Sequence, residues 1–185
     1  MTYGTLSGSY PGTSKFLHWL VAISVLTTIP VAYFMNRVAE GPLQNNLYNF
    51  HKSLGVLIFV LMILRVINRL AVGAPAPDPT LKRWERALSS AVHGLLYLLL
   101  LVMPILGYVA NSAYGAATPF FGLFNIPPIV GNNEALAEGL FTAHRRMGWL
   151  VAILAAMHIA AALQHFVLRR DGVLQRMLPR ALGGV

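Results

Sequence analysis

The sequence has no cysteine and few charged residues: Asp, Glu, Lys and Arg together make up only 11% of its 185 residues. The absence of cysteine excludes disulfides, thiolate zinc sites, iron-sulfur clusters and the cysteine attachment of c-type haem. Histidine is then the strongest metal ligand available. The apolar share of 56% lies outside the range of soluble domains. The composition therefore predicts a membrane protein.

Acidic residues are scarcer still, with six Asp and Glu against 14 Lys and Arg, for a formal net charge of +8. The basic residues form no block of the kind that binds nucleic acid. They lie between long apolar runs, where they indicate membrane topology. The sequence also offers no carboxylate pair and no Ser-His-Asp arrangement for hydrolysis.

Four apolar segments are each long enough to cross a hydrocarbon core of about 30 Å. We expect one domain over residues 1–185, folded as an all-α bundle of four transmembrane helices with spans at about 16–34, 47–70, 87–110 and 140–168. Residues 111–139 form the longest connection, and its aromatic and proline content favours a cap at the membrane interface. The tail from Asp171 alternates apolar residues with Arg176 and Arg180, as an interfacial segment does.

The basic residues are divided unevenly between the two ends of this bundle. The end with both termini and the second connection has Lys15, Arg65, Arg69, Lys82, Arg83, Arg86, Arg169, Arg170, Arg176 and Arg180. The opposite end has Arg37, Lys52, Arg145 and Arg146. The positive-inside rule therefore predicts that both termini are cytoplasmic.

The fourth segment has three of the chain's six histidines on one helical face. Alternating steps of four and three residues along the helix lead from His144 to His158 and on to His165, so the three share one face. Only Gly, Val and Ala residues lie on this face between His144 and His158. His144 and His158 are 14 residues apart, which is about 21 Å along a helix. Two histidines separated by small residues indicate two sites with room for a flat or bulky group.

The other segments supply histidines at matching depths. His51 begins the second span from the same end as His144. His18 and His93 both lie near the depth of His158, and depth alone does not choose between them. A pair of histidines at each level is what two bis-histidine haems held between helices require.

The residues beside the outer histidines have two interpretations each. Gly55 and Gly148 each follow a histidine by four residues, and serve either haem packing or close helix packing without a cofactor. Lys52, Arg145 and Arg146 either attract an anion and contact haem propionates or simply extend to water. Intramembrane histidines also occur in proton paths, so a haem-free histidine-relay transporter stays a second alternative.

Short motifs over nearly the whole chain resemble the bacterial cytochrome b-561 family. They are His18-Trp19-Leu20, His51-Lys52-Ser53-Leu54-Gly55, Arg65 with Arg69, His93-Gly94-Leu95, Pro104-Ile105-Leu106-Gly107, His144, the segment from His158 to His165, and the tail from Asp171 to Arg180. The resemblance implies a multi-pass protein of the bacterial inner membrane with two haems b. It implies that His18, rather than His93, pairs with His158, and that His51 and His144 hold the outer haem.

The resemblance further implies electron transfer between the outer aqueous side and the quinone pool, with a superoxide oxidase as the best-defined enzyme of the family. Superoxide would give electrons to the outer haem, and two such electrons would reduce ubiquinone. The cations at Lys52, Arg145 and Arg146 would concentrate a small anion at that side. The alternative is a membrane anchor that passes electrons from a docked periplasmic dehydrogenase or hydrogenase to quinone.

The quinone head group needs hydrogen-bond donors beside an apolar slot. His165 is the first candidate, because it continues the histidine face toward the inner surface. Arg65, Trp84 and His93 are the others. The alternative for His165 is that it only extends to water or binds a lipid phosphate.

Overall fold

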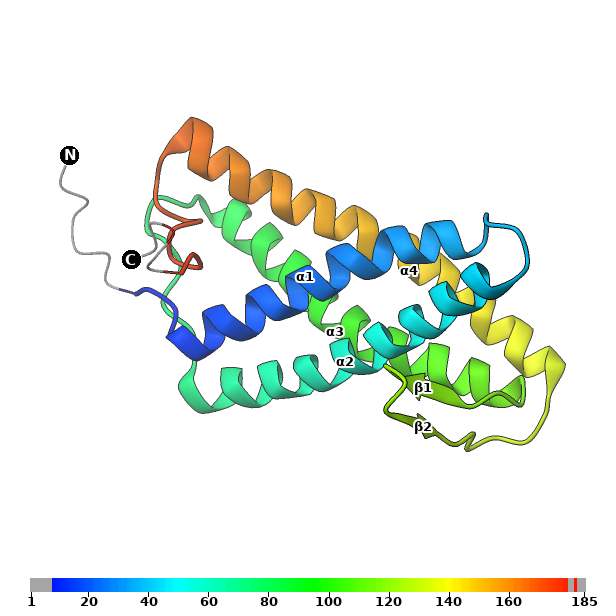
Figure 1. The fold of residues 1–185 in the computed structure, drawn as a ribbon. Helices are drawn as coiled ribbons and strands as arrows, with labels where there is room; N and C mark the ends of the chain where they lie inside the picture. The colour runs from blue at the N-terminus through cyan, green and yellow to red at the C-terminus, as the bar shows by residue number, and fades with distance from the viewer. Residues whose placement is uncertain (1–7, 180–181, 183–185) are drawn as a thin grey trace.

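The computed structural model describes residues 8–179 and 182, which form four long helices and a small β-hairpin (Figure 1). All four helices are long and apolar enough to cross a membrane, which is consistent with the predicted bundle of four spans. Arg180 and the end of the predicted interfacial tail lie outside the described residues. The helices are α1 (Gly12–Met35), α2 (Pro42–Val72), α3 (Arg83–Ala113) and α4 (Glu134–Gln164), and a π-helical turn, η1 (His165–Arg169), continues α4.

Helices α3 and α4 begin before the apolar runs that predict them, and at the start of each a polar side chain satisfies a free amide. At α4 the Asn133 side chain accepts a hydrogen bond from the Leu136 N–H at 3.0 Å. At α3 the Glu85 carboxylate accepts one from the Lys82 N–H at 2.7 Å. At α2 the first residue is Pro42, which has no amide hydrogen to satisfy.

The chain runs back and forth along the bundle, so that its connections lie at two ends (Figure 1). We call the end with the N-terminal segment, the C-terminal tail and the α2–α3 connection the termini end. The tail folds back there: the Arg176 guanidinium is buried and donates to the Gly8 carbonyl at 2.8 and 2.9 Å and to the Ala76 carbonyl at 2.6 Å. These bonds attach the tail to the rest of the termini end, and its location at the membrane interface stays a prediction.

The opposite end, the hairpin end, has the α1–α2 turn and the strands β1 (Thr118–Phe120) and β2 (Phe124–Ile126). The strands are antiparallel, with Thr118 opposite Ile126. The Ser53 hydroxyl of α2 accepts a hydrogen bond from the Phe121 N–H at 2.9 Å and donates one to the Pro119 carbonyl at 3.0 Å. The long connection is therefore folded and attached to α2 close to His51.

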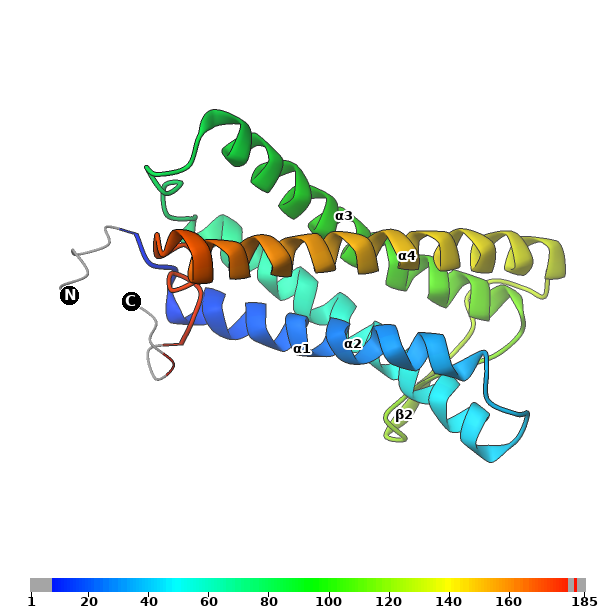
Figure 2. The same cartoon turned by 90° about the horizontal axis from the view of Figure 1, so that it is seen from above.

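The helices pack as two close pairs, α1 with α2 and α3 with α4, and α2 also packs on α3. Among the described residues α4 does not pack closely against α1 or α2. The two helices α1 and α4 cross in the view of Figure 1, and Figure 2 shows α4 extending along the length of the bundle. The buried core lies near the middle of the helices. It includes Val21, Val25, Ile58, Met62, Leu99, Val151 and Leu154.

Candidate functional site

His51 and His144 face each other near the hairpin end, one from each close helix pair. Their ring centroids are 6.0 Å apart, and the rings are inclined at 85°. His144 Nδ1 lies 3.0 Å from the Met103 carbonyl, which can only accept, so this nitrogen has the hydrogen. His51 Nδ1 lies 3.2 Å from the Thr28 hydroxyl. These contacts leave Nε2 of each ring available as a possible metal ligand.

Three glycines shape the space around this pair. A Cβ at Gly107 would lie 3.0 Å from the His144 ring, so the absence of a side chain lets the imidazole lie against α3. A Cβ at Gly55 would meet nothing within 4 Å, and one at Gly148 would meet only the Met103 methyl at 3.7 Å. The two predicted glycines therefore have open space beside them rather than a tightly packed helix.

His158 lies farther along α4 and has two histidine neighbours. Its ring centroid is 6.1 Å from that of His18 on α1 and 4.9 Å from that of His93 on α3. His93 is exposed, and its Nδ1 lies 2.6 Å from the Ser89 carbonyl. The structure thus places both candidates at this depth, His18 and His93, close to His158.

The ring separations allow a test of metal ligation. A metal–imidazole bond is about 2 Å and a ring centroid lies about 1 Å behind its nitrogen, so two rings on opposite sides of one metal have centroids about 6 Å apart. His51 with His144, and His18 with His158, have this separation. The distance between His93 and His158 is shorter. The His₂ donor sets, between helices that do not pack closely, fit two bis-histidine haems.

The predicted outer cations lie next to the first pair. Lys52 is half-buried, while Arg145 and Arg146 are exposed. Arg145 donates to the Thr142 hydroxyl at 3.1 Å. Within the described part of the chain none of the three forms an ion pair with a carboxylate, so their charge is not neutralised locally.

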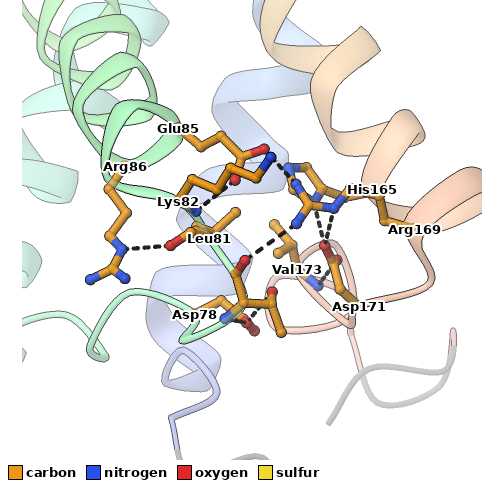
Figure 3. Close-up of polar contacts among 10 residues, drawn as sticks. Asp78, Leu81, Lys82, Glu85, Arg86, His165, Arg169, Asp171 and Val173 are labelled. Atoms are coloured by element: carbon orange, nitrogen blue, oxygen red, sulfur yellow. Dashed lines mark hydrogen bonds and ion pairs between the residues drawn. The ribbon is translucent and has the colours of Figure 1, made fainter.

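The four quinone candidates do not form one site. His165 lies in a polar network at the termini end, where its Nδ1 is 2.5 Å from Asp171 (Figure 3). Arg169 joins this network through Glu85 at 2.6 Å and Asp171 at 3.3 Å. Trp84, the neighbour of Glu85, is exposed.

Arg65 belongs to a different group, on α2 and α3. Its Nε donates to the Tyr97 hydroxyl at 2.8 Å, and Tyr97 is four residues after His93.

Four residues of these contacts were not predicted to have a role: Asp171, Tyr97, Gly107 and Thr28. Tyr97 and Gly107 share a helical face with His93, which is a signal that could have found them. Asp171 is the first acidic residue after His165. Thr28 has no such signal, because its contact with His51 depends on how α1 and α2 pack.

Comparison with known proteins gives consistent matches. Residues 9–180 match the family described as prokaryotic cytochrome b561. The chain is 30% identical over 186 residues to cytochrome b561 homolog 2 of Escherichia coli (strain K12), covering 97% of this chain and 92% of that protein. It is 28% identical over 169 residues to cytochrome b561 homolog 1 of the same organism, covering 91% of this chain and 96% of that protein. It is 29% identical over 170 residues to the probable superoxide oxidase CybB of Yersinia pestis, covering 90% of this chain and 94% of that protein.

Proposed function

Because the chain belongs to the prokaryotic cytochrome b561 family, we propose that it is a dihaem b-type cytochrome that oxidises superoxide outside the bacterial inner membrane and reduces ubiquinone. Membership makes the chain a membrane cytochrome with haem b as its cofactor, so the haem-free transporter alternative is dropped. Residues 1–185 would form a single domain. One relative is named a probable superoxide oxidase, which supports the choice of substrate.

The observation that carries this proposal is the pair of histidine separations. His51 and His144 would hold an outer haem, and His18 and His158 an inner haem, with centroid distances of 6.0 and 6.1 Å. The bonds of His51 to Thr28 and of His144 to Met103 would fix the outer rings. Gly55 and Gly148 would leave room for the porphyrin.

The bound haems would supply one-electron transfer: two superoxide anions give two dioxygen molecules, and ubiquinone takes up two electrons and two protons to give ubiquinol. His51 with His144 and His18 with His158 would hold the haems that carry out this electron transfer. The chain's residues would attract superoxide at one end, position the quinone at the other and supply its protons.

The distribution of charge supports cytoplasmic termini. At the termini end Arg69, Lys82, Arg83, Arg86 and Arg170 are exposed, whereas at the hairpin end the exposed cations are Arg37, Arg145 and Arg146. The positive-inside rule then puts the hairpin end outside. Superoxide would approach from that side.

Replacing both Arg145 and Arg146 by Gln is expected to slow superoxide oxidation by roughly tenfold at low ionic strength and to weaken its salt dependence, because local positive charge concentrates the anion. Stopped-flow haem reduction by superoxide at several salt concentrations measures this. Arg37→Gln is the control, since Arg37 is exposed at the same end and lies over the Tyr33 ring, but is not adjacent in sequence to a histidine. An unchanged salt dependence in the double variant would exclude the anion-attracting role.

His165 and Asp171 would serve the quinone. The Asp171 carboxylate holds Nδ1 of His165, which leaves Nε2 to bond a quinone oxygen and give it a proton. A π-helical turn begins at His165, and such turns are frequent at functional sites. Trp84 would lie beside this site.

Replacing Asp171 by Asn is expected to slow ubiquinone reduction by about 10²-fold, since a proton donor contributes at least that much, and to leave haem reduction by superoxide unchanged. His165→Gln should act in the same direction. Separate stopped-flow measurements of haem reduction and of reoxidation by quinone distinguish the two steps. Reoxidation at the wild-type rate in both variants would move the quinone site away from His165.

The proposal as a whole is tested with purified protein, potassium superoxide and a ubiquinone analogue. One molecule of ubiquinol should form for every two superoxide anions consumed. Added superoxide dismutase should abolish ubiquinol formation. Haem that dithionite reduces but superoxide does not would contradict the proposal. It would favour the membrane-anchor alternative, with a docked periplasmic dehydrogenase or hydrogenase as electron donor.

A further inference from the structure

Arg65 has a buried guanidinium nitrogen that binds nothing in the described part of the chain. Its Nε donates to the Tyr97 hydroxyl, but Nη1 is buried without a hydrogen-bond partner. A buried charged donor left unpaired is costly. This nitrogen therefore lacks an acceptor that the described residues could supply.

The surroundings of Arg65 offer no anion. Its pocket is also lined by Ser14, Asn68 and Arg69, which are neutral or positive. The chain has six Asp and Glu, all among the described residues, and their ion pairs are made with His165 and Arg169 only. The described part of the chain therefore supplies no anion for Nη1.

The register of the helices places Arg65 at the level of the inner histidines. Arg65 follows His51 by 14 residues on the same face of α2, just as His158 follows His144 by 14 residues on α4. Both helices run from the hairpin end to the termini end (Figure 1). Arg65 also lies close enough to His18 and His158 to interact electrostatically with both.

We propose that Arg65 binds a propionate carboxylate of the inner haem through Nη1, while Tyr97 holds the guanidinium in place. This inference rests on the proposed function, because it requires a haem between His18 and His158. It removes Arg65 from the quinone candidates. Arginine suits this role because its planar group binds carboxylates through several N–H groups at once.

Replacing Arg65 by Gln should lower the midpoint potential of the inner haem, because a nearby positive charge disfavours the ferric state. At a fixed ambient potential the ferrous-to-ferric ratio should fall by roughly tenfold or more. The potential should also become pH-dependent, because an unpaired propionate takes up a proton when the iron is reduced. The titratable or charged groups around Arg65 are Tyr97 and His93 on α3, His18 on α1, His158 on α4, Arg69 on α2 and Tyr10 of the N-terminal segment.

Spectroscopic redox titrations of the dihaem protein at several pH values test this. The outer haem serves as an internal reference, and Arg83→Gln removes an exposed charge from the same end as a matched control. The outer haem of Arg65→Gln and both haems of Arg83→Gln should keep their wild-type potentials. Tyr97→Phe should shift the inner haem in the same direction but less.

An inner potential in Arg65→Gln that stays at the wild-type value and independent of pH would overturn the inference. Loss of bound phospholipid from that variant, measured as phosphorus, with an unchanged potential would also overturn it and identify a lipid phosphate as the anion. If Arg65→Gln loses the inner haem, Tyr97→Phe decides: a lowered inner potential supports the inference, and an unchanged one overturns it. A wild-type protein without two haems would instead contradict the proposed function.

Discussion

Alanine in place of His51 or His144 is expected to give a protein with one haem per chain, in which the inner haem is retained. Each imidazole would supply one of the two axial bonds of the outer haem, so loss of either removes it. The inner haem should remain, because its site lies about 21 Å away along α4 and the core residues Val151 and Leu154 lie between them. Haem content per protein and the reduced-minus-oxidised spectrum measure the result.

Two glycines of α3 offer a matched pair of variants for the same site. Gly107→Ala keeps both outer histidines but puts a methyl group 3.0 Å from the His144 ring, whereas a Cβ at Gly94 would meet nothing within 4 Å. The first should weaken binding of the outer haem, and the second should not. Full dihaem content in both His51→Ala and His144→Ala would show that these residues are not the ligands.

Loss of the inner haem alone is the expected result for His18→Ala and for His158→Ala. The separation of 6.1 Å between their rings suits two ligands of one metal, whereas 4.9 Å between His93 and His158 is shorter than such an arrangement gives. His93→Ala should therefore keep two haems. Haem content and spectra of the three variants measure this.

The comparison of His18 with His93 is decisive because both lie near His158. Full dihaem content in His18→Ala, together with loss of a haem in His93→Ala, would assign the ligand to His93. The Nδ1 hydrogen bond of His93 to the Ser89 carbonyl leaves its Nε2 free, so this outcome has a chemical basis.

The sequence predicted the four helices because their apolar runs exceed the bilayer thickness, but it did not predict their ends. Those ends depend on single polar residues such as Glu85 and Asn133, which satisfy amides outside the apolar run. The β-hairpin was missed because its strands have only three residues each and depend on the Ser53 hydroxyl, which is distant in sequence. The hydrogen bonds of Arg176 were missed for the same reason, since its carbonyl partners come from other segments.

The site was predictable where it depends on helical periodicity. The spacing of His144 and His158, and the depth of His51, follow from the rise and turn of a helix. What periodicity does not fix is how neighbouring helices rotate and approach. The contact of Gly107 with His144 and the bond of Arg65 to Tyr97 are of this second kind, and they appear only once the helices are packed.

The central claim is that two haems lie between facing histidines at the two levels of the bundle. It is tested most directly by the visible spectrum and haem-to-protein ratio of the detergent-purified protein, oxidised and then reduced with dithionite. The account predicts a low-spin b-type spectrum and two haems per chain. A colourless protein, or one with a five-coordinate high-spin haem at either level, would contradict it.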